Sequence, residues 1–169
     1  EGGLAPTESA QDGEVEDHKV WVWRLPKGTK WVQLPDTSPW GVDVCVDSND
    51  GQIRHVADDF ECTQSGPITQ ITLWGSWRQD RAGKIQRIHL EIHPDDPVGS
   101  AGSDPSNRYS KPGPEVLWSM DFGPGQFYAK RYHQVYAPGE WWQDKVGEEQ
   151  QAGGDAEIWQ LDLSVDSAA

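Results

Sequence analysis

Basic residues, cysteine and methionine are scarce in this chain of 169 residues, which has 14 Lys plus Arg against 28 Asp plus Glu, 2 Cys and 1 Met. The formal net charge of −14 repels phosphate backbones and anionic lipids, so nucleic acid is a poor candidate partner. No apolar run approaches the roughly 20 residues of a membrane-spanning helix, which disfavours membrane insertion. No nucleotide-binding loop, dinucleotide-binding fingerprint or zinc-finger spacing occurs.

The scarcity of cysteine leaves one possible disulfide pair, Cys45 with Cys62. Their spacing is not the Cys-x-x-Cys of a redox dithiol or a zinc knuckle. In an acidic chain with few lysines we expect these two residues to form a disulfide, which would stabilise the fold by about 3 kcal/mol. The disulfide and the acidic composition together predict a secreted protein, extracellular or at the cell surface.

Alternation of apolar and polar side chains runs through most of the chain and predicts short β-strands rather than helices. The expected strands cover residues 20–26, 30–35, 41–47, 52–62, 68–77, 84–93, 115–122, 126–137 and 156–165. Asn49-Asp50-Gly51 is a strong hairpin signal. The pattern predicts an all-β fold, an antiparallel β-sandwich of the jelly-roll type.

Three segments depart from this alternation. Residues 1–17 are small, polar and acidic, and we expect a flexible acidic tail there, followed by a single β-sandwich domain over 18–169. Residues 94–114 hold five prolines and predict a long surface loop. Only residues 140–152 have the composition of a short helix, which Gly147 weakens.

Three titratable residues, His89, Glu91 and His93, alternate with apolar residues in one expected strand. Strand geometry places them on one face, and two imidazoles with a carboxylate can bind Zn, Cu or Fe(II). Same-face neighbours lie about 6.6–7 Å apart, so one ion reaches all three only with a bulge or a ligand from another strand. A solvated polar face is the simpler interpretation, and a transition metal is the less favoured cofactor.

A second set of candidate metal ligands is Asp58 and Asp59, with further acidic residues upstream between Asp43 and Asp50. Clustered carboxylates in loops suit a structural Ca²⁺, which takes six to eight oxygen ligands. The spacing is not that of an EF-hand. Hydrogen bonding of the two carboxylates to turn amides is the alternative, and we favour it.

Tryptophan is unusually frequent, with 10 residues, and each buried indole removes about 150–250 Å² from water. Aromatic rings in turns or on an exposed sheet face can instead stack against the C–H face of a sugar. Trp141 and Trp142 are adjacent, so only one of them can point inward if the chain is extended there. The candidate ligand-binding residues are Trp40, Tyr128, Tyr132, Tyr136, Trp141 and Trp142.

The segment VADDFECTQSGPITQITLWGSW, residues 56–77, resembles a poorly characterised β-sandwich domain that carries A-D-D-F-x-C, G-P-I-T and W-G-S-W in this order. That domain is found in secreted and surface-sorted proteins of planctomycete-type bacteria, and weaker similarity extends over about residues 30–163. The resemblance implies an extracellular β-sandwich and provides no catalytic residues. Its pattern continues with further strands after the equivalent of residues 158–163, so we expect an incomplete sheet whose edge can recruit a strand.

These observations leave three functions open. The first is a non-catalytic binding module, most simply for a polysaccharide or another surface glycan. The second is a homo-oligomer or filament subunit of a surface layer that assembles by strand exchange. The third, less favoured, is a metal-dependent enzyme that uses His89, Glu91 and His93, whose spacing along a strand makes it hard for one ion to reach all three. Nucleophilic catalysis finds little support, because no G-x-S-x-G elbow is present.

Overall fold

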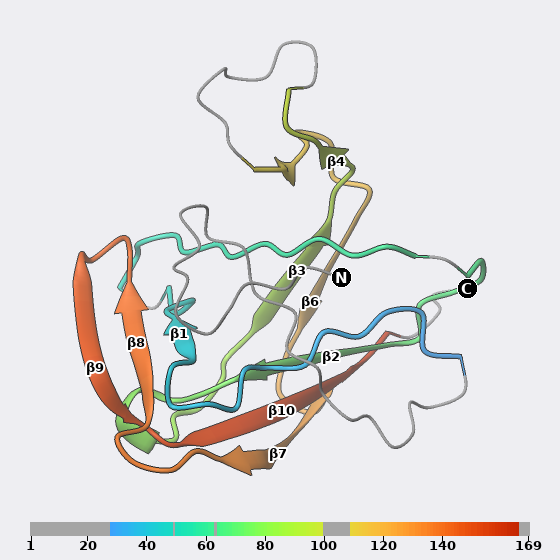
Figure 1. Ribbon diagram of the computed structural model, residues 1–169. Coiled ribbons are helices and arrows are strands. Elements are labelled where there is room, and N and C mark those ends of the chain that lie inside the picture. The colour runs from blue at the N-terminus through green and yellow to red at the C-terminus, as the bar shows by residue number, and fades with distance from the viewer. Residues whose placement is uncertain (1–27, 49, 63, 100–108, 166–169) are drawn as a thin grey trace, which may run out of the picture.

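The computed structural model describes residues 28–48, 50–62, 64–99 and 109–165, and the regular structure within them is almost entirely β-strand (Figure 1). The strands are β1 (Val42–Val44), β2 (Gln70–Gly75), β3 (Ile88–Ile92), β4 (Asp95–Asp96), β5 (Lys111–Pro112), β6 (Trp118–Phe122), β7 (Phe127–Gln134), β8 (Glu140–Asp144), β9 (Glu149–Asp155) and β10 (Glu157–Ser164). One short 3-10 turn in the described residues, η1 (Arg78–Asp80), follows β2. The expected all-β, antiparallel fold is confirmed.

The strands of the described residues pair into sheets of order β1-β8-β9, β2-β10-β7, β3-β6 and β4-β5. Every pair is antiparallel except β1 with β8, which run parallel. The parallel pair joins residues that are distant in the sequence, with Val42 opposite Trp141. It therefore brings the beginning of the described chain against its C-terminal third.

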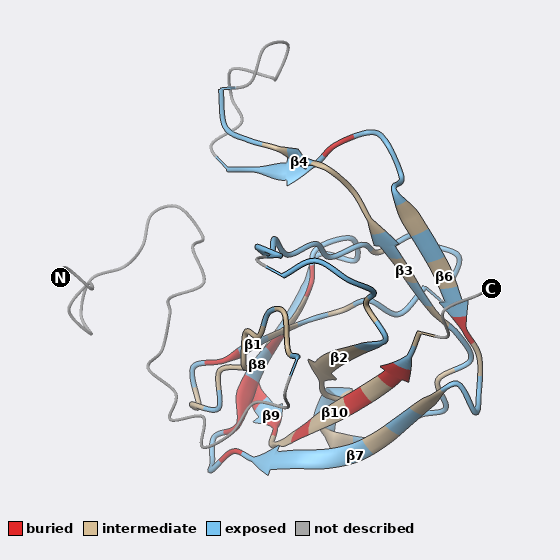
Figure 2. Cartoon of the chain, turned by 90° about the vertical axis from the view of Figure 1, so that its right-hand side faces the viewer, coloured by how far each residue is buried: buried red, intermediate tan, exposed pale blue. Residues whose placement is uncertain are grey.

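The hydrophobic core lies between the β2-β10-β7 sheet and the β3-β6 ladder. Phe122 of β6 and Leu163 of β10 are fully buried, and Leu161 packs with them. Leu73 and Ala129 are the cross-strand partners of Leu161, and they face the same core. Figure 2 shows the buried positions spaced along β10. Polar and aromatic residues occupy the other side of the β2-β10-β7 sheet.

The proline-rich segment forms an arm rather than a plain loop. Asp95 pairs with Pro112 and Asp96 with Lys111, so β4 and β5 continue the β3-β6 ladder away from the main body (Figure 1). The Gly113 N–H donates to the carbonyl oxygen of Pro94 (2.8 Å) and ties the base of the arm. Residues 100–108, within the expected loop, lie outside the described part of the chain.

Two of the expected strands are wrong. Residues 30–35 and 52–62 contain no strand, and the apolar side chains of Ile53, Val56 and Phe60 are exposed because no sheet covers them. The turn before the second segment does form, since the Gly51 N–H donates to the carbonyl oxygen of Ser48 (3.2 Å), but no strand follows it as a hairpin would require. The expected tail at 1–17 and strand at 20–26 lie outside the described residues.

The helix expected within residues 140–152 is also wrong. This segment forms the β8-β9 hairpin, in which Gln143 pairs with Gln150 and Asp144 with Glu149. Glu148 adopts a positive φ of 55° at the turn, which a helix would not allow. Cross-strand pairing therefore overrides the helical propensity of this glutamate-rich stretch.

The expected disulfide is absent, and Cys45 and Cys62 are free thiols. Cys45 follows β1, where its backbone N–H donates to the carbonyl oxygen of Gln143 (2.8 Å). Cys62 is exposed, and its thiol donates to the carbonyl oxygen of Gln64 (3.3 Å). The expectation failed because residues 52–62 do not pair with β1 as a hairpin. Among the described residues, no helix is long and apolar enough to cross a membrane.

Candidate functional site

The β2-β10-β7 sheet has an outer face, opposite the core, which we call the tyrosine face. Side chains alternate along a strand, so the residues on this face are the neighbours of the core residues Leu73, Leu161 and Ala129. The tyrosine face consists of Thr72, Trp74, Tyr128, Lys130, Tyr132, Gln160 and Asp162.

Asp162 is the centre of the polar part of the tyrosine face. Its Oδ1 accepts hydrogen bonds from Gln160 Nε2 (2.7 Å) and Thr72 Oγ1 (2.9 Å), and Lys130 Nζ lies 3.3 Å from Oδ2. Burial favours the protonated acid, but these contacts outweigh it and hold the pKa of Asp162 below its ordinary value. The tyrosine face therefore presents the ionised carboxylate of Asp162 together with an amide, a hydroxyl and an ammonium group. Their contacts with Asp162 hold these groups in place.

Two tyrosines of β7 provide the aromatic part of this face. Tyr128 is 66% exposed and Tyr132 is 39% exposed. The Tyr132 ring meets Trp74 edge to face, with centroids 5.9 Å apart and an interplanar angle of 69°. The indole Nε1 of Trp74 is buried without a hydrogen-bond partner. Trp74 thus supports Tyr132 from within the sheet, and the two tyrosine rings are the aromatic surface that a ligand can reach.

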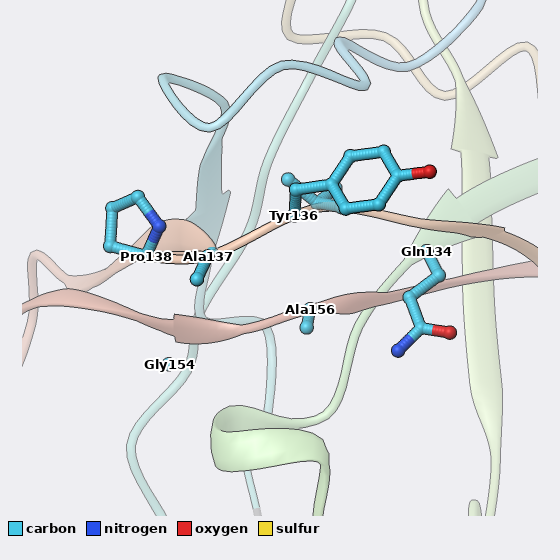
Figure 3. A pocket seen from close by; sticks show the side chains of 8 residues that line it. Gln134, Tyr136, Ala137, Pro138, Gly154 and Ala156 are labelled. Atoms are coloured by element: carbon cyan, nitrogen blue, oxygen red, sulfur yellow. The ribbon is translucent and has the colours of Figure 1, made fainter.

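Tyr136 lies beyond the end of β7 and is 85% exposed. It lines an open depression of about 440 Å³ (Figure 3). Figure 3 shows Tyr136, Ala137 and Pro138 following one another along one side of this depression, with Ala156 and Gly154 on the neighbouring segment. The three candidate tyrosines are therefore divided, with Tyr128 and Tyr132 on the tyrosine face and Tyr136 at this depression.

The candidate tryptophans lie on the other three-stranded sheet. Trp141 on β8 is exposed, as is Trp40 just before β1. Trp142 is only 8% exposed, and the Arg78 guanidinium covers it at 4.0 Å from the ring centroid. The expectation that only one of the adjacent pair points inward is confirmed. Trp142 is a packing residue, and its predicted contact with a ligand is not available in this arrangement.

His89 and Glu91 of β3 and His93, which directly follows β3, lie together on one side of the chain, as expected. Glu91 bridges the two imidazoles, with His89 Nε2 at 3.1 Å from Oε1 and His93 Nε2 at 3.0 Å from Oε2. The remaining ring nitrogens are also engaged, since His89 Nδ1 lies 2.8 Å from Asp121 Oδ1 and His93 Nδ1 lies 2.8 Å from the carbonyl oxygen of Gly113. The hydrogen bonds with Glu91 raise the pKa of both histidines and lower the pKa of Glu91. All four ring nitrogens thus have hydrogen-bond partners within the protein.

Asp58 and Asp59 are exposed, and the Asp59 N–H donates to Asp58 Oδ1 (3.1 Å) in a segment without regular structure. The acidic loop upstream of them is organised by a guanidinium, because Arg54 donates to both carboxylate oxygens of Asp50 (2.7 and 2.9 Å). In the part of the chain that the structure describes, no group of three or more His, Cys, Asp or Glu side chains is arranged to hold a metal ion.

A second cluster of acids was not expected from the sequence. We call Asp43, Glu140 and Asp155 the buried acidic cluster. Glu140 and Asp155 are direct partners across β8 and β9, and Asp43 comes from the parallel neighbour β1. Ser76 donates a side-chain hydrogen bond to Asp43, and the backbone N–H of Gln79 in η1 donates to Asp155. Residues from β1, β8, β9 and the turn after β2 therefore converge here.

The electrostatics of this cluster are unfavourable for ionised carboxylates. The pKa of Glu140 is raised to about 8, mainly by burial and secondly by the negative charges of Asp43 and Asp36. Burial raises the pKa of Asp43 to about 6 against the hydrogen bond from Ser76, and it also raises the pKa of Asp155. Glu140 Oε2 and Asp155 Oδ2 are buried without a hydrogen-bond partner. Such groups cost about 1–3 kcal/mol each when nothing compensates them.

The sequence did contain one signal for this cluster. Along β8, Glu140, Trp142 and Asp144 are buried while Trp141 between them is exposed, which is the period of two of a strand. The signal was missed because the buried members include two acids, and acids are ordinarily assigned to the solvent side.

The tyrosine face and the buried acidic cluster both lie in a segment that matches a protein family. The model of one protein family, described as Domain of unknown function (DUF7901), matches residues 29–168. The match covers most of the chain, so the chain belongs to this family. No curated protein and no solved structure has significant similarity to it.

Proposed function

We propose that this member of the DUF7901 family is a non-catalytic binding module for polysaccharide, which it holds on the tyrosine face. The observation that carries the proposal is the combination of exposed Tyr128 and Tyr132 rings with the polar groups around Asp162 on one sheet face. A pyranose ring offers an apolar C–H face for stacking and hydroxyl groups for hydrogen bonding, and it needs both kinds of partner.

The arrangement of these groups supports a preformed site. Tyr132 is held by Trp74, and Asp162 is held by Thr72, Gln160 and Lys130, so few side chains would lose freedom when a ligand binds. Binding sites that are already ordered lose less entropy on association. A flat sheet face also suits an extended sugar chain better than a single small molecule.

The exposed tryptophans Trp40 and Trp141 form the weaker candidate surface. Their exposed neighbours on β1 are Val42 and Val44, which offer no hydrogen bonds to hydroxyl groups. We therefore assign sugar stacking to Tyr128 and Tyr132 first.

The test is retention of the purified protein on a panel of immobilised polysaccharides that includes cellulose and xylan. We expect retention of the unmodified protein and a three- to tenfold loss of affinity, roughly, for each of Tyr128→Ala and Tyr132→Ala, because one aromatic contact is removed each time. Binding should persist in EDTA, since the proposed contacts are made by aromatic rings and hydrogen-bonding side chains.

Tyr109→Ala is the matched control, because Tyr109 is equally exposed but lies on the β4-β5 arm. It should bind as the unmodified protein does. Absence of retention on every polysaccharide of the panel, or equal losses for Tyr109→Ala and Tyr128→Ala, would contradict the proposal.

We also propose an extracellular location, on the strength of the acidic composition and of the resemblance of residues 56–77. Self-assembly by strand exchange is the second candidate function, and it is favoured by the position of β7 as an outer strand of its sheet within the described residues. Lys130 and Arg131 on β7 weaken it, because charged side chains on an edge strand oppose pairing with another copy. A strict monomer by light scattering at high protein concentration would exclude assembly.

A further inference from the structure

We propose that the buried acidic cluster binds one hard divalent cation, Ca²⁺ by preference, through Glu140 and a second carboxylate of the cluster together with backbone carbonyl and water oxygens. This site is distinct from the tyrosine face and does not depend on the proposed function.

Glu140 and Asp155 are buried carboxylates whose hydrogen-bonding capacity is only partly satisfied. Glu140 is 3% exposed and Asp155 is 0% exposed, and each has a side-chain oxygen without a hydrogen-bond partner. Native proteins rarely leave such groups unpaired, and buried charges are normally paired or coordinate a metal.

Glu140 points toward the chain just before β1. A Cβ atom built on Gly41 would collide with Glu140 Oε1, so this carboxylate lies directly against the backbone of Gly41. The carbonyl oxygen of Asp36 lies 3.2 Å from the same point. A carboxylate oxygen and a carbonyl oxygen therefore both border the place that a side chain at Gly41 would occupy. Hard cations such as Ca²⁺ are bound by this combination of oxygens.

Within the residues that the structure describes, no basic side chain forms an ion pair with the cluster. None of the ion pairs within the described residues involves Asp43, Glu140 or Asp155. Arg78 is the basic residue whose charge favours ionised Asp155, and its guanidinium is committed to Glu149 (2.9 Å) and to the Trp142 ring. A bound cation would supply the missing positive charge.

The choice of ion follows from the donors. The cluster contains oxygen atoms only, which disfavours Zn²⁺ and Cu²⁺ relative to Ca²⁺ or Mg²⁺. No three acidic side chains of the described residues already form a complete ligand set, so carbonyl and water oxygens must contribute. Ca²⁺ accepts irregular shells of six to eight oxygens, whereas Mg²⁺ demands near-ideal octahedral geometry.

The experiment is thermal unfolding of the full chain at neutral pH in EDTA, with excess Ca²⁺ and with excess Mg²⁺. We expect Ca²⁺ to raise the melting temperature by about 5–10 °C and Mg²⁺ to raise it less, because a ligand of the native state stabilises by mass action. Calorimetric titration with Ca²⁺ should give one site per chain. Unchanged melting in Ca²⁺ without measurable heat of binding would overturn the proposal.

Glu140→Gln is the diagnostic variant and Glu149→Gln the matched control on the neighbouring strand. Glu140→Gln keeps the size of the side chain and carries no charge, so it should fold in EDTA, and it should lose the response to Ca²⁺. Glu149→Gln should keep the full response. An undiminished response in Glu140→Gln and in a second variant, Asp155→Asn, would place the ion elsewhere and refute the assignment. Polysaccharide retention of Glu140→Gln should stay normal, which separates this result from the test of the tyrosine face.

Discussion

Asp144 and Glu140 occupy the two ends of β8, and both carboxylates are buried, yet their surroundings are opposite. Asp144 receives two hydrogen bonds from the Arg54 guanidinium (2.9 and 2.7 Å) and one from the backbone N–H of Val146 (3.0 Å). Arg54 holds the pKa of Asp144 far below its ordinary value. Glu140 faces Asp43 and Asp155, and its pKa is raised to about 8.

Burial alone therefore does not decide the charge state of an acid. Asp144 is ionised because Arg54 pairs with it from a distant segment of the chain, whereas the neighbours of Glu140 bear the same sign of charge. One end of β8 holds an ion pair, and the other end holds a cluster of acids. Substitutions near either end of β8 should therefore have different effects on stability.

The largest effect is expected for Asp144→Ala. The side chains of Arg54 and Asp144 are only 7% and 8% exposed, so the variant leaves a buried guanidinium with one partner removed. We expect the melting temperature to fall on the order of 10 °C, because breaking a buried pair on one side is strongly destabilising. Asp50→Asn is the control, since Asp50 binds the same guanidinium from a side chain that is 55% exposed. Equal effects of the two variants would mean that burial does not distinguish these partners.

An intermediate effect is expected for Gly41→Ala at the other end of β8. The added methyl group would collide with the Glu140 carboxylate, and overpacking of this kind costs about 1–3 kcal/mol. In a Glu140→Ala background the same substitution should cost less, because the colliding atoms are gone. Urea unfolding of the four proteins of this double-mutant cycle measures the coupling. Gly75→Ala is the control, as a methyl group there meets no atom within 4 Å.

The smallest effect is expected for the exposed trio His89, Glu91 and His93. Both histidines have pKa values above the ordinary 6.5, so their contribution to stability is present below pH 6.5 and is lost as the pH rises through the raised values. The pKa of Glu91 is below the ordinary 4.5, so its contribution is present above pH 4.5 and is lost as the pH falls. The trio should therefore stabilise most between pH 4.5 and 6.5.

Glu91→Gln should flatten this part of the dependence of the urea midpoint on pH, because it removes the carboxylate that both imidazoles share. Glu61→Gln, at an exposed position outside the trio, should leave the curve unchanged. If Glu91→Gln also leaves it unchanged, the hydrogen bonds of the trio do not persist in solution.

Much of the fold could be predicted from alternation, because burial of one sheet face selects apolar residues at every second position. The core strands β2, β3, β6, β7 and β10 all lie within expected strands. The prediction failed at residues 30–35 and 52–62, where alternating side chains found no neighbouring strand, and at β8 and β9, where buried acids and glutamines concealed the period. Of the candidate site, the exposure of the tyrosines and the common side of His89, Glu91 and His93 followed from local geometry.

The β-structure, the acidic surface and the residues of each strand that share a side could be predicted from the sequence, because these depend on composition and on the two-residue repeat of an extended chain. Which acid meets which charge depends instead on the tertiary structure. Glu140 faces Asp43 because β1 runs parallel to β8, and Asp144 pairs with Arg54 because the segment that carries Arg54 reaches the other end of β8. Contacts between residues so far apart in the chain, and the pKa values that follow from them, exist only once the sheets have formed.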